Sequence, residues 1–268
     1  PTGPLLSVPF AILPTAPSEA GDPAAMPWLA RAAPIVVAPS LASFTALRGR
    51  PQPATATIDF AGFGAFVPHG DAERVLAGLD MPPITCARQA TAIAEIAPLP
   101  ATGPEVRAVA ANFSRARTGL GPDFTEAAVE AVAAAGGARV VYFATHGLLP
   151  ADLGCLPEPG LTTSLPATAD DADVAVLSAC DTAAGGRPDG GEALSGLARA
   201  FFVAGARAVV ASHWKVFDEP TADLMTSMFQ AGGEPDYARA LHEAQLRMMD
   251  DPARAHPVNW GAFAYFGG

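Results

Sequence analysis

The chain has 268 residues, of which half are hydrophobic and only 16% are charged. This length suits one large core or two small domains, and the composition argues against a disordered or solvating tail. The formal net charge of −11 makes nonspecific binding to nucleic acid or to an anionic membrane a poor expectation.

Cysteine content and hydropathy bear on where the protein works. Three cysteines are too few for a disulfide framework, and none form a C-x-x-C pair, so a reducing compartment such as the cytoplasm is expected. The uncharged stretches 1–18 and 32–47 contain prolines and polar residues, so no membrane-spanning helix is predicted. The chain lacks a basic secretory start and begins with Pro1, and we expect it to be a fragment of a longer protein.

The first part of the chain, 1–103, is rich in Pro, Ala and Gly and shows weak periodicity. Strand-like runs occur at 34–37 and 57–60. The isolated Gly-Phe-Gly at 62–64 is too weak a signal for a phosphate site, and no Walker A or dinucleotide motif accompanies it. The pattern of this part therefore does not predict the order of its helices and strands.

The second part, 104–268, alternates helices and strands. A helix is predicted over about 126–135, with Thr125 as N-cap. Later helices are indicated by apolar residues at helical spacing after 194, after 220 and after 237. Continuous apolar runs typical of strands buried on both faces occupy 140–144, 174–177, 208–211 and 263–266. This pattern predicts an α/β fold, a doubly wound αβα sandwich with a mostly parallel central sheet.

Two of these strands end in residues that could perform catalysis. His146 follows the run at 140–144, and Cys180 follows the run at 174–177. If the strands are parallel neighbours, both side chains emerge at the same sheet edge, where reactive groups of open α/β sheets gather. A thiolate is a strong nucleophile, and an imidazole can take its proton and return it to a leaving group. Gly147 lets the backbone approach a substrate carbonyl closely. The ordinary alternatives are a small buried cysteine and a structural histidine.

The sequence around both residues resembles a known family. The stretches VYFATHG (141–147) and VLSACDT (176–182) resemble the two signature motifs of the CHAT family, caspase-like cysteine peptidase domains often found with tetratricopeptide repeats. Further similarity covers 191–201, 205–214 and parts of the first hundred residues. The resemblance makes 1–103 the N-terminal part of a caspase-like domain and 104–268 its catalytic part.

The resemblance implies a site. Cys180 would be the nucleophile that forms a thioester, and His146 would be the general base and acid. The backbone N–H groups of Gly147 and Cys180 would form the oxyanion hole. Two features depart from the pattern: the connection over 147–173 is short and loop-like, and a flexible stretch at 185–191 is either a gating loop or a mobile surface loop.

Substrate contacts are predicted more loosely. By resemblance, Trp214 would wall the substrate groove, with a core tryptophan as the alternative. Asp181 and Asp218 could form an acidic pocket that prefers Arg or Lys before the cut, or they could serve turns and caps. His213 also ends a strand and is a rival base to His146.

These features predict a cysteine endopeptidase with a Cys180/His146 dyad that cleaves a protein partner, in a bacterial regulated-proteolysis or defence system. No cofactor, metal, nucleic acid or membrane partner is expected. A regulatory domain or a sensor protein outside this chain is expected as a partner. The alternatives are an inactive caspase-like scaffold that only binds proteins, and a thiol hydrolase or transferase for small substrates.

Overall fold

The fold is seen in a computed structural model that describes residues 8–17, 21–38, 41–49, 56–78, 83–148, 160–164, 172–178, 196–230 and 236–268. The strands in these ranges are β1 (Val36–Val37), β2 (Ile58–Gly64), β3 (Ala116–Leu120), β4 (Ala138–Ala144), β5 (Gly147–Leu148), β6 (Gly160–Leu161), β7 (Ala172–Ser178), β8 (Ala208–Ser212) and β9 (Phe263–Gly267). The α-helices are α1 (Leu41–Gly49), α2 (Ala72–Gly78), α3 (Pro83–Ala94), α4 (Thr102–Ala110), α5 (Glu126–Ala134), α6 (Gly196–Val203), α7 (Asp218–Phe229) and α8 (Tyr237–Asp250).

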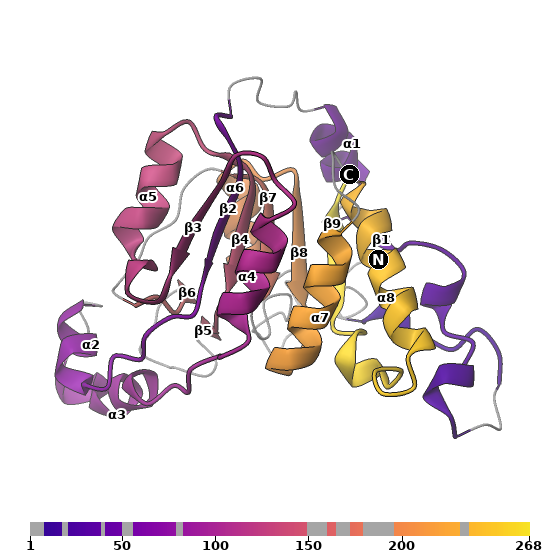
Figure 1. The fold of residues 1–268 in the computed structure, drawn as a ribbon, viewed down its shortest axis with the longest axis horizontal. Coiled ribbons are helices and arrows are strands. Elements are labelled where there is room, and N and C mark those ends of the chain that lie inside the picture. The colour runs from indigo at the N-terminus through magenta and orange to yellow at the C-terminus, as the bar shows by residue number, and fades with distance from the viewer. Residues whose placement is uncertain are drawn as a thin grey trace.

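Seven strands form one sheet in the order β1-β9-β8-β7-β4-β2-β3, while β5 and β6 form a separate antiparallel pair (Figure 1). The strands β3, β2, β4, β7 and β8 run in one direction, and β9 and β1 run in the other. The predicted mostly parallel sheet is therefore confirmed. The two-residue β1 pairs with the outer side of β9, and short pairing of this kind protects a sheet edge.

Helices cover both faces of the sheet, as the predicted αβα sandwich requires. The helices α4, α7 and α8 lie on one face (Figure 1). They pack there against a core that includes Phe60, Tyr142 and Val210 of the strands. On the other face, α5 and α6 pack against a second core that includes Phe63 and Phe143. Because side chains alternate along a strand, neighbouring residues of β2 and β4 serve opposite cores, and both strands are almost completely buried.

The predicted elements of the second part are present. Thr125 caps α5 as predicted, because its Oγ1 accepts a hydrogen bond from the N–H of Ala128 at 3.2 Å. The predicted run 174–177 lies inside β7, and the strand pairs in parallel with β4 along its whole length. The loop-like connection between these strands contains the β5–β6 pair.

The first part of the chain contributes more to the core than its weak pattern indicated. The strand β2 lies between β3 and β4 in the central sheet, and residue 103 lies inside α4. Gly62 and Gly64 allow this helix to approach: a Cβ at Gly62 would lie 2.7 Å from Val106 Cγ1, and one at Gly64 would lie 3.1 Å from Val106 Cγ2. The glycines at 62–64 thus permit close helix–strand packing.

Candidate active site

The two strands that precede the predicted catalytic residues are parallel neighbours. Ala144 at the end of β4 is paired with Ser178 at the end of β7. His146 follows Ala144 by two residues, and Cys180 follows Ser178 by two residues. The predicted adjacency of these strands is confirmed. Cys180 and Asp181 themselves lie outside the described residues, as does the stretch 185–191.

The main chain at His146 is held by the β6 segment. The buried Thr145 donates from Oγ1 to the carbonyl of Thr162 at 2.6 Å. The N–H of Thr162 donates to the His146 carbonyl at 2.9 Å, and the N–H of His146 donates to Thr162 Oγ1 at 3.2 Å. These bonds give the histidine a defined backbone position at the sheet edge.

The imidazole of His146 is oriented by two contacts. Its Nε2 lies 2.9 Å from the carbonyl oxygen of Ala97, and its ring meets the edge of Phe66 at a centroid distance of 5.5 Å and an interplanar angle of 83°. A carbonyl oxygen only accepts hydrogen bonds, so this contact assigns the proton to Nε2 and leaves the lone pair on Nδ1. The half-buried ring is therefore prepared to act as a base through Nδ1.

Gly147 starts the short strand β5 and is paired with Leu161 of β6. Bonded and non-bonded pairs alternate in an antiparallel ladder. Since Thr162 donates to His146, the next pair, Gly147 with Leu161, is the non-bonded one. The N–H of Gly147 therefore points away from β6.

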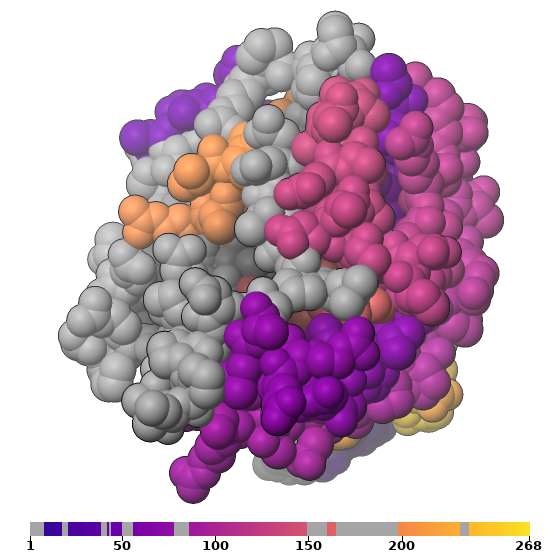
Figure 2. All heavy atoms as spheres, turned by 90° about the vertical axis from the view of Figure 1, so that its left-hand side faces the viewer, coloured from indigo at the N-terminus to yellow at the C-terminus, as the bar shows by residue number. Residues whose placement is uncertain are grey.

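The α2–α3 hairpin stands at the carboxyl edge of the sheet, and its atoms lie below α5 in Figure 2. Its small core of Val75, Ala90 and Ile93 packs against Ile96 and Leu148. These two residues directly adjoin Ala97 and Gly147. The hairpin thus supports both the carbonyl that faces His146 and the glycine that follows it.

The predicted substrate residues that the structure describes have other neighbours. Trp214 is half-buried and packs against the core beneath α4, α7 and α8. Asp218 begins α7, and its Oδ2 accepts a hydrogen bond from the N–H of Ala101 at 2.8 Å. Its Oδ1 is buried and has no hydrogen-bond partner among the described residues. The predicted roles of these two residues, Trp214 at the substrate groove and Asp218 in an acidic pocket, stay predictions.

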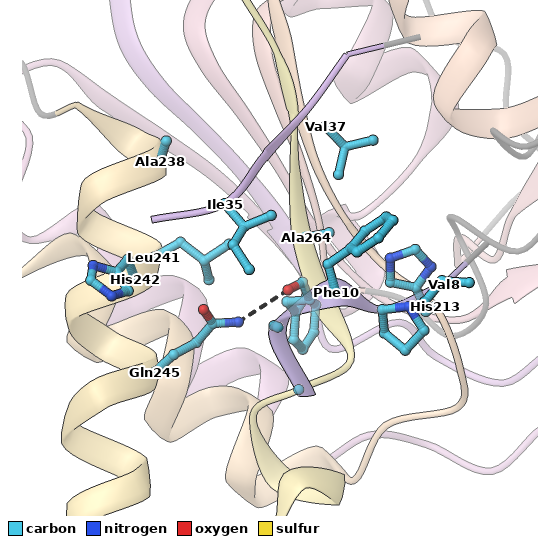
Figure 3. Close-up of a pocket in the computed structure, with 14 residues that line it drawn as sticks. Val8, Phe10, Ile35, Val37, His213, Ala238, Leu241, His242, Gln245 and Ala264 are labelled. Carbon is cyan, nitrogen blue, oxygen red and sulfur yellow. Dashed lines mark hydrogen bonds between the residues drawn. The ribbon is translucent and has the colours of Figure 1, made fainter. Parts of the chain in front are cut away.

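His213, the rival base, lines a pocket that does not include His146. Figure 3 shows it beside Val8 and Phe10 of the N-terminal segment, with Gln245 and other residues of α8 on the opposite side. Its Nδ1 is buried without a hydrogen-bond partner among the described residues, and burial lowers the pKa of the ring to about 4. The ring is therefore neutral at physiological pH and lies in a pocket lined largely by apolar residues.

Cys86 differs from the expectation of free thiols. It is buried in α3 and is disulfide-bonded. The chain's other two cysteines, Cys155 and Cys180, both lie outside the described residues. The redox state must therefore be controlled in any experiment on Cys180.

Sequence reasoning missed the groups that hold the histidine. Ala97 acts through its carbonyl oxygen, and every residue has one, so no sequence signal identifies it. Thr162 and Phe66 lie far from His146 in the sequence, and only the fold brings them together. Within the described ranges, no cluster of three or more His, Cys, Asp or Glu side chains could hold a metal ion. None of the helices described is both long and apolar enough to span a bilayer.

The described residues define an α/β protein that presents an oriented histidine at the edge of a central parallel strand. The chain belongs to the CHAT domain family, whose model matches residues 1–268. This match confirms the predicted family, and the αβα sandwich agrees with the predicted caspase-like fold class.

Several solved structures are similar to the chain. Two separase–securin complexes of Saccharomyces cerevisiae match with 14% identity over 87% of this chain and 14% of the separase chain, at TM-scores of 0.48 and 0.46. The Arg-specific cysteine proteinase gingipain R matches with 13% identity over 62% of this chain and 41% of its own, at a TM-score of 0.39. This chain thus spans only a minor part of each of these proteins. None of the curated proteins matches it.

Proposed function

We propose that this chain is the catalytic domain of a cysteine endopeptidase with a Cys180/His146 dyad. The observation that carries the proposal is the register of β4 and β7: each residue follows, by two positions, one member of the Ala144–Ser178 pair. Equal offsets from paired residues of parallel strands favour close approach of the two side chains at the sheet edge. Membership of the CHAT family supports the same assignment.

In the proposed reaction, Nδ1 of His146 takes the proton of the Cys180 thiol, and the thiolate attacks the peptide carbonyl carbon. The electron pair of the C=O bond moves to oxygen, and the N–H groups of Gly147 and Cys180 stabilise the anion. The imidazolium returns the proton to the departing amine as the C–N bond breaks, which leaves a thioester. Water, deprotonated by His146, then hydrolyses the thioester and restores the thiol.

The His146 contacts support the direction of this proton transfer. The Ala97 carbonyl holds the proton on Nε2, so that the lone pair on Nδ1 is free to accept the thiol proton. The same carbonyl stabilises the imidazolium, which keeps an N–H at Nε2. A carbonyl that orients a catalytic base in this way serves the role that a carboxylate has in other hydrolytic triads.

We further propose a protein substrate, with Asp181 and Trp214 at the substrate groove and a basic residue before the cut. A regulatory domain or sensor outside this chain would control the site, in a bacterial, cytoplasmic proteolytic or defence system. The alternative is a role other than that of an enzyme, in which the chain is a caspase-like scaffold that binds proteins without catalysis.

The test is labelling of the full chain with biotinylated peptidyl acyloxymethyl ketones, which alkylate a catalytic cysteine. Labelling after treatment with dithiothreitol is expected in the wild type, and its loss is expected in Cys180→Ala and in His146→Ala. His213→Leu should retain it. Labelling that survives Cys180→Ala, or that depends on His213 instead of His146, would refute the dyad. A chain that folds but is never labelled, even with its partner domains present, would support the scaffold role.

A further inference from the structure

The carbonyl that orients His146 belongs to an exposed segment with little packing of its own. Residues 97–101 read Ala-Pro-Leu-Pro-Ala, and Ala97, Pro98 and Pro100 are all exposed. A segment without buried side chains depends on its end contacts for a fixed position. Its two prolines restrict the backbone, so a constraint at residue 101 is transmitted towards residue 97.

The C-terminal end of this segment is held by a carboxylate from a distant part of the chain. Ala101 is the N-cap residue of α4, and alanine has no side-chain oxygen to offer the helix. Asp218, at the start of α7, accepts the hydrogen bond of the Ala101 N–H at 2.8 Å. Asp218 is the first residue inside α7, and the hydrogen bond of its side chain is directed to the 97–101 segment instead of to its own helix.

A second anchor lies beside the first. Thr102 donates from Oγ1 to the Leu99 carbonyl at 2.7 Å and accepts from the N–H of Ala65 at 3.0 Å. Ala65 precedes Phe66, whose ring contacts His146. Both groups that orient the imidazole are therefore connected to the same hydrogen-bonded junction.

We propose that Asp218 is a positioning residue that holds the 97–101 segment and thereby fixes the Nε2–H tautomer and the orientation of His146. The proposal rests on the proposed peptidase function and replaces a substrate-binding role for this carboxylate. Asp218 does not need to touch the substrate, because its hydrogen bond acts through the Ala97 carbonyl.

The comparison uses Asp218→Ala, Asp218→Asn and the control Glu219→Ala in the full chain. Asparagine removes the charge but retains an oxygen that can accept from Ala101. Glu219 lies in the same first helical turn, carries the same charge and is exposed, with an ion pair to Arg254. The control therefore reports any general effect of charge at the start of α7.

The first readout is the tautomer of His146, measured by ¹⁵N NMR and assigned by comparison with His146→Gln. We expect Nε2–H in the wild type, in Asp218→Asn and in Glu219→Ala, and a mixture of tautomers in Asp218→Ala. This measurement does not require catalysis. An unchanged tautomer in a folded Asp218→Ala protein would overturn the proposal.

The second readout is the rate of Cys180 labelling by ketone probes with Arg or Leu before the reactive group. We expect Asp218→Ala to slow labelling roughly 10- to 100-fold with both probes, which is the usual cost of a misplaced catalytic group, and Asp218→Asn to recover most of the rate. A loss confined to the Arg probe and not recovered by asparagine would instead establish substrate binding and overturn positioning. A wild type that is never labelled, even with its partner domains present, would disprove the peptidase function, whereas the NMR comparison would still decide whether Asp218 controls the histidine.

Discussion

His213 makes the stability of this protein depend on pH. Burial without a partner for Nδ1 lowers the pKa of the folded-state ring to about 4, against an ordinary value of 6.5. As the pH falls below 6.5, the unfolded chain takes up a proton that the folded chain does not accept until about pH 4. Folding stability from this group is therefore complete at neutral pH and is lost as the pH falls through this window.

Linkage between these two pKa values gives a loss of about 2 kcal/mol between about pH 7.5 and about pH 5. The variant His213→Leu places an apolar side chain in a pocket lined largely by apolar residues and removes the titrating group. Urea unfolding can be followed by tryptophan fluorescence, because Trp260 is completely buried. We expect the wild type to lose about 2 kcal/mol more stability than His213→Leu on acidification.

Other groups titrate over the same range, so the difference between the two proteins is the relevant quantity. The control His256→Asn removes an exposed histidine whose Nδ1 caps a short helix, a role that asparagine can also fill, and it tests whether the loss of a histidine elsewhere in the chain has the same effect as His213→Leu. If wild type and His213→Leu lose equal stability on acidification, the folded ring accepts protons as readily as the unfolded one. That result would refute the argument from burial.

Three further predictions concern other contacts. Tyr142→Phe removes the phenol that donates to the buried carboxyl of Glu105, and urea unfolding should show a loss of about 1–3 kcal/mol; an unchanged stability would mean that water replaces the phenol. Thr125→Ala removes the N-cap of α5 and should cost about 1 kcal/mol in the same assay, with Thr125→Ser as the variant that retains the cap. Thr162→Val removes the buried hydroxyl that accepts from the His146 N–H, so urea unfolding should show a loss of about 1–3 kcal/mol and probe labelling of Cys180 in the folded protein should slow; equal labelling rates would show that this hydrogen bond is not needed for the proposed reaction.

The elements with strong hydrophobic patterns were predictable because the spacing of apolar side chains shows which faces of a strand or helix are buried. The runs at 140–144 and 208–211 fall in the strands β4 and β8, and Thr125 indicated the start of α5 correctly. The central position of β2 was not predictable from its short and glycine-containing pattern. Its place depends on pairing with β3 and β4 through backbone groups that every residue shares.

The same division applies to the site. The sequence alone predicted His146 and Cys180 as site residues and the two strands that precede them, because both motifs follow recognisable apolar runs; the parallel pairing of these strands is confirmed. Only the tertiary structure decided that the Ala97 carbonyl faces the imidazole, that Asp218 accepts a hydrogen bond from Ala101 of the same segment, and that the ring of His213 is largely buried. These outcomes depend on hydrogen bonds and burial between residues far apart in the chain, and no local pattern of side chains records them.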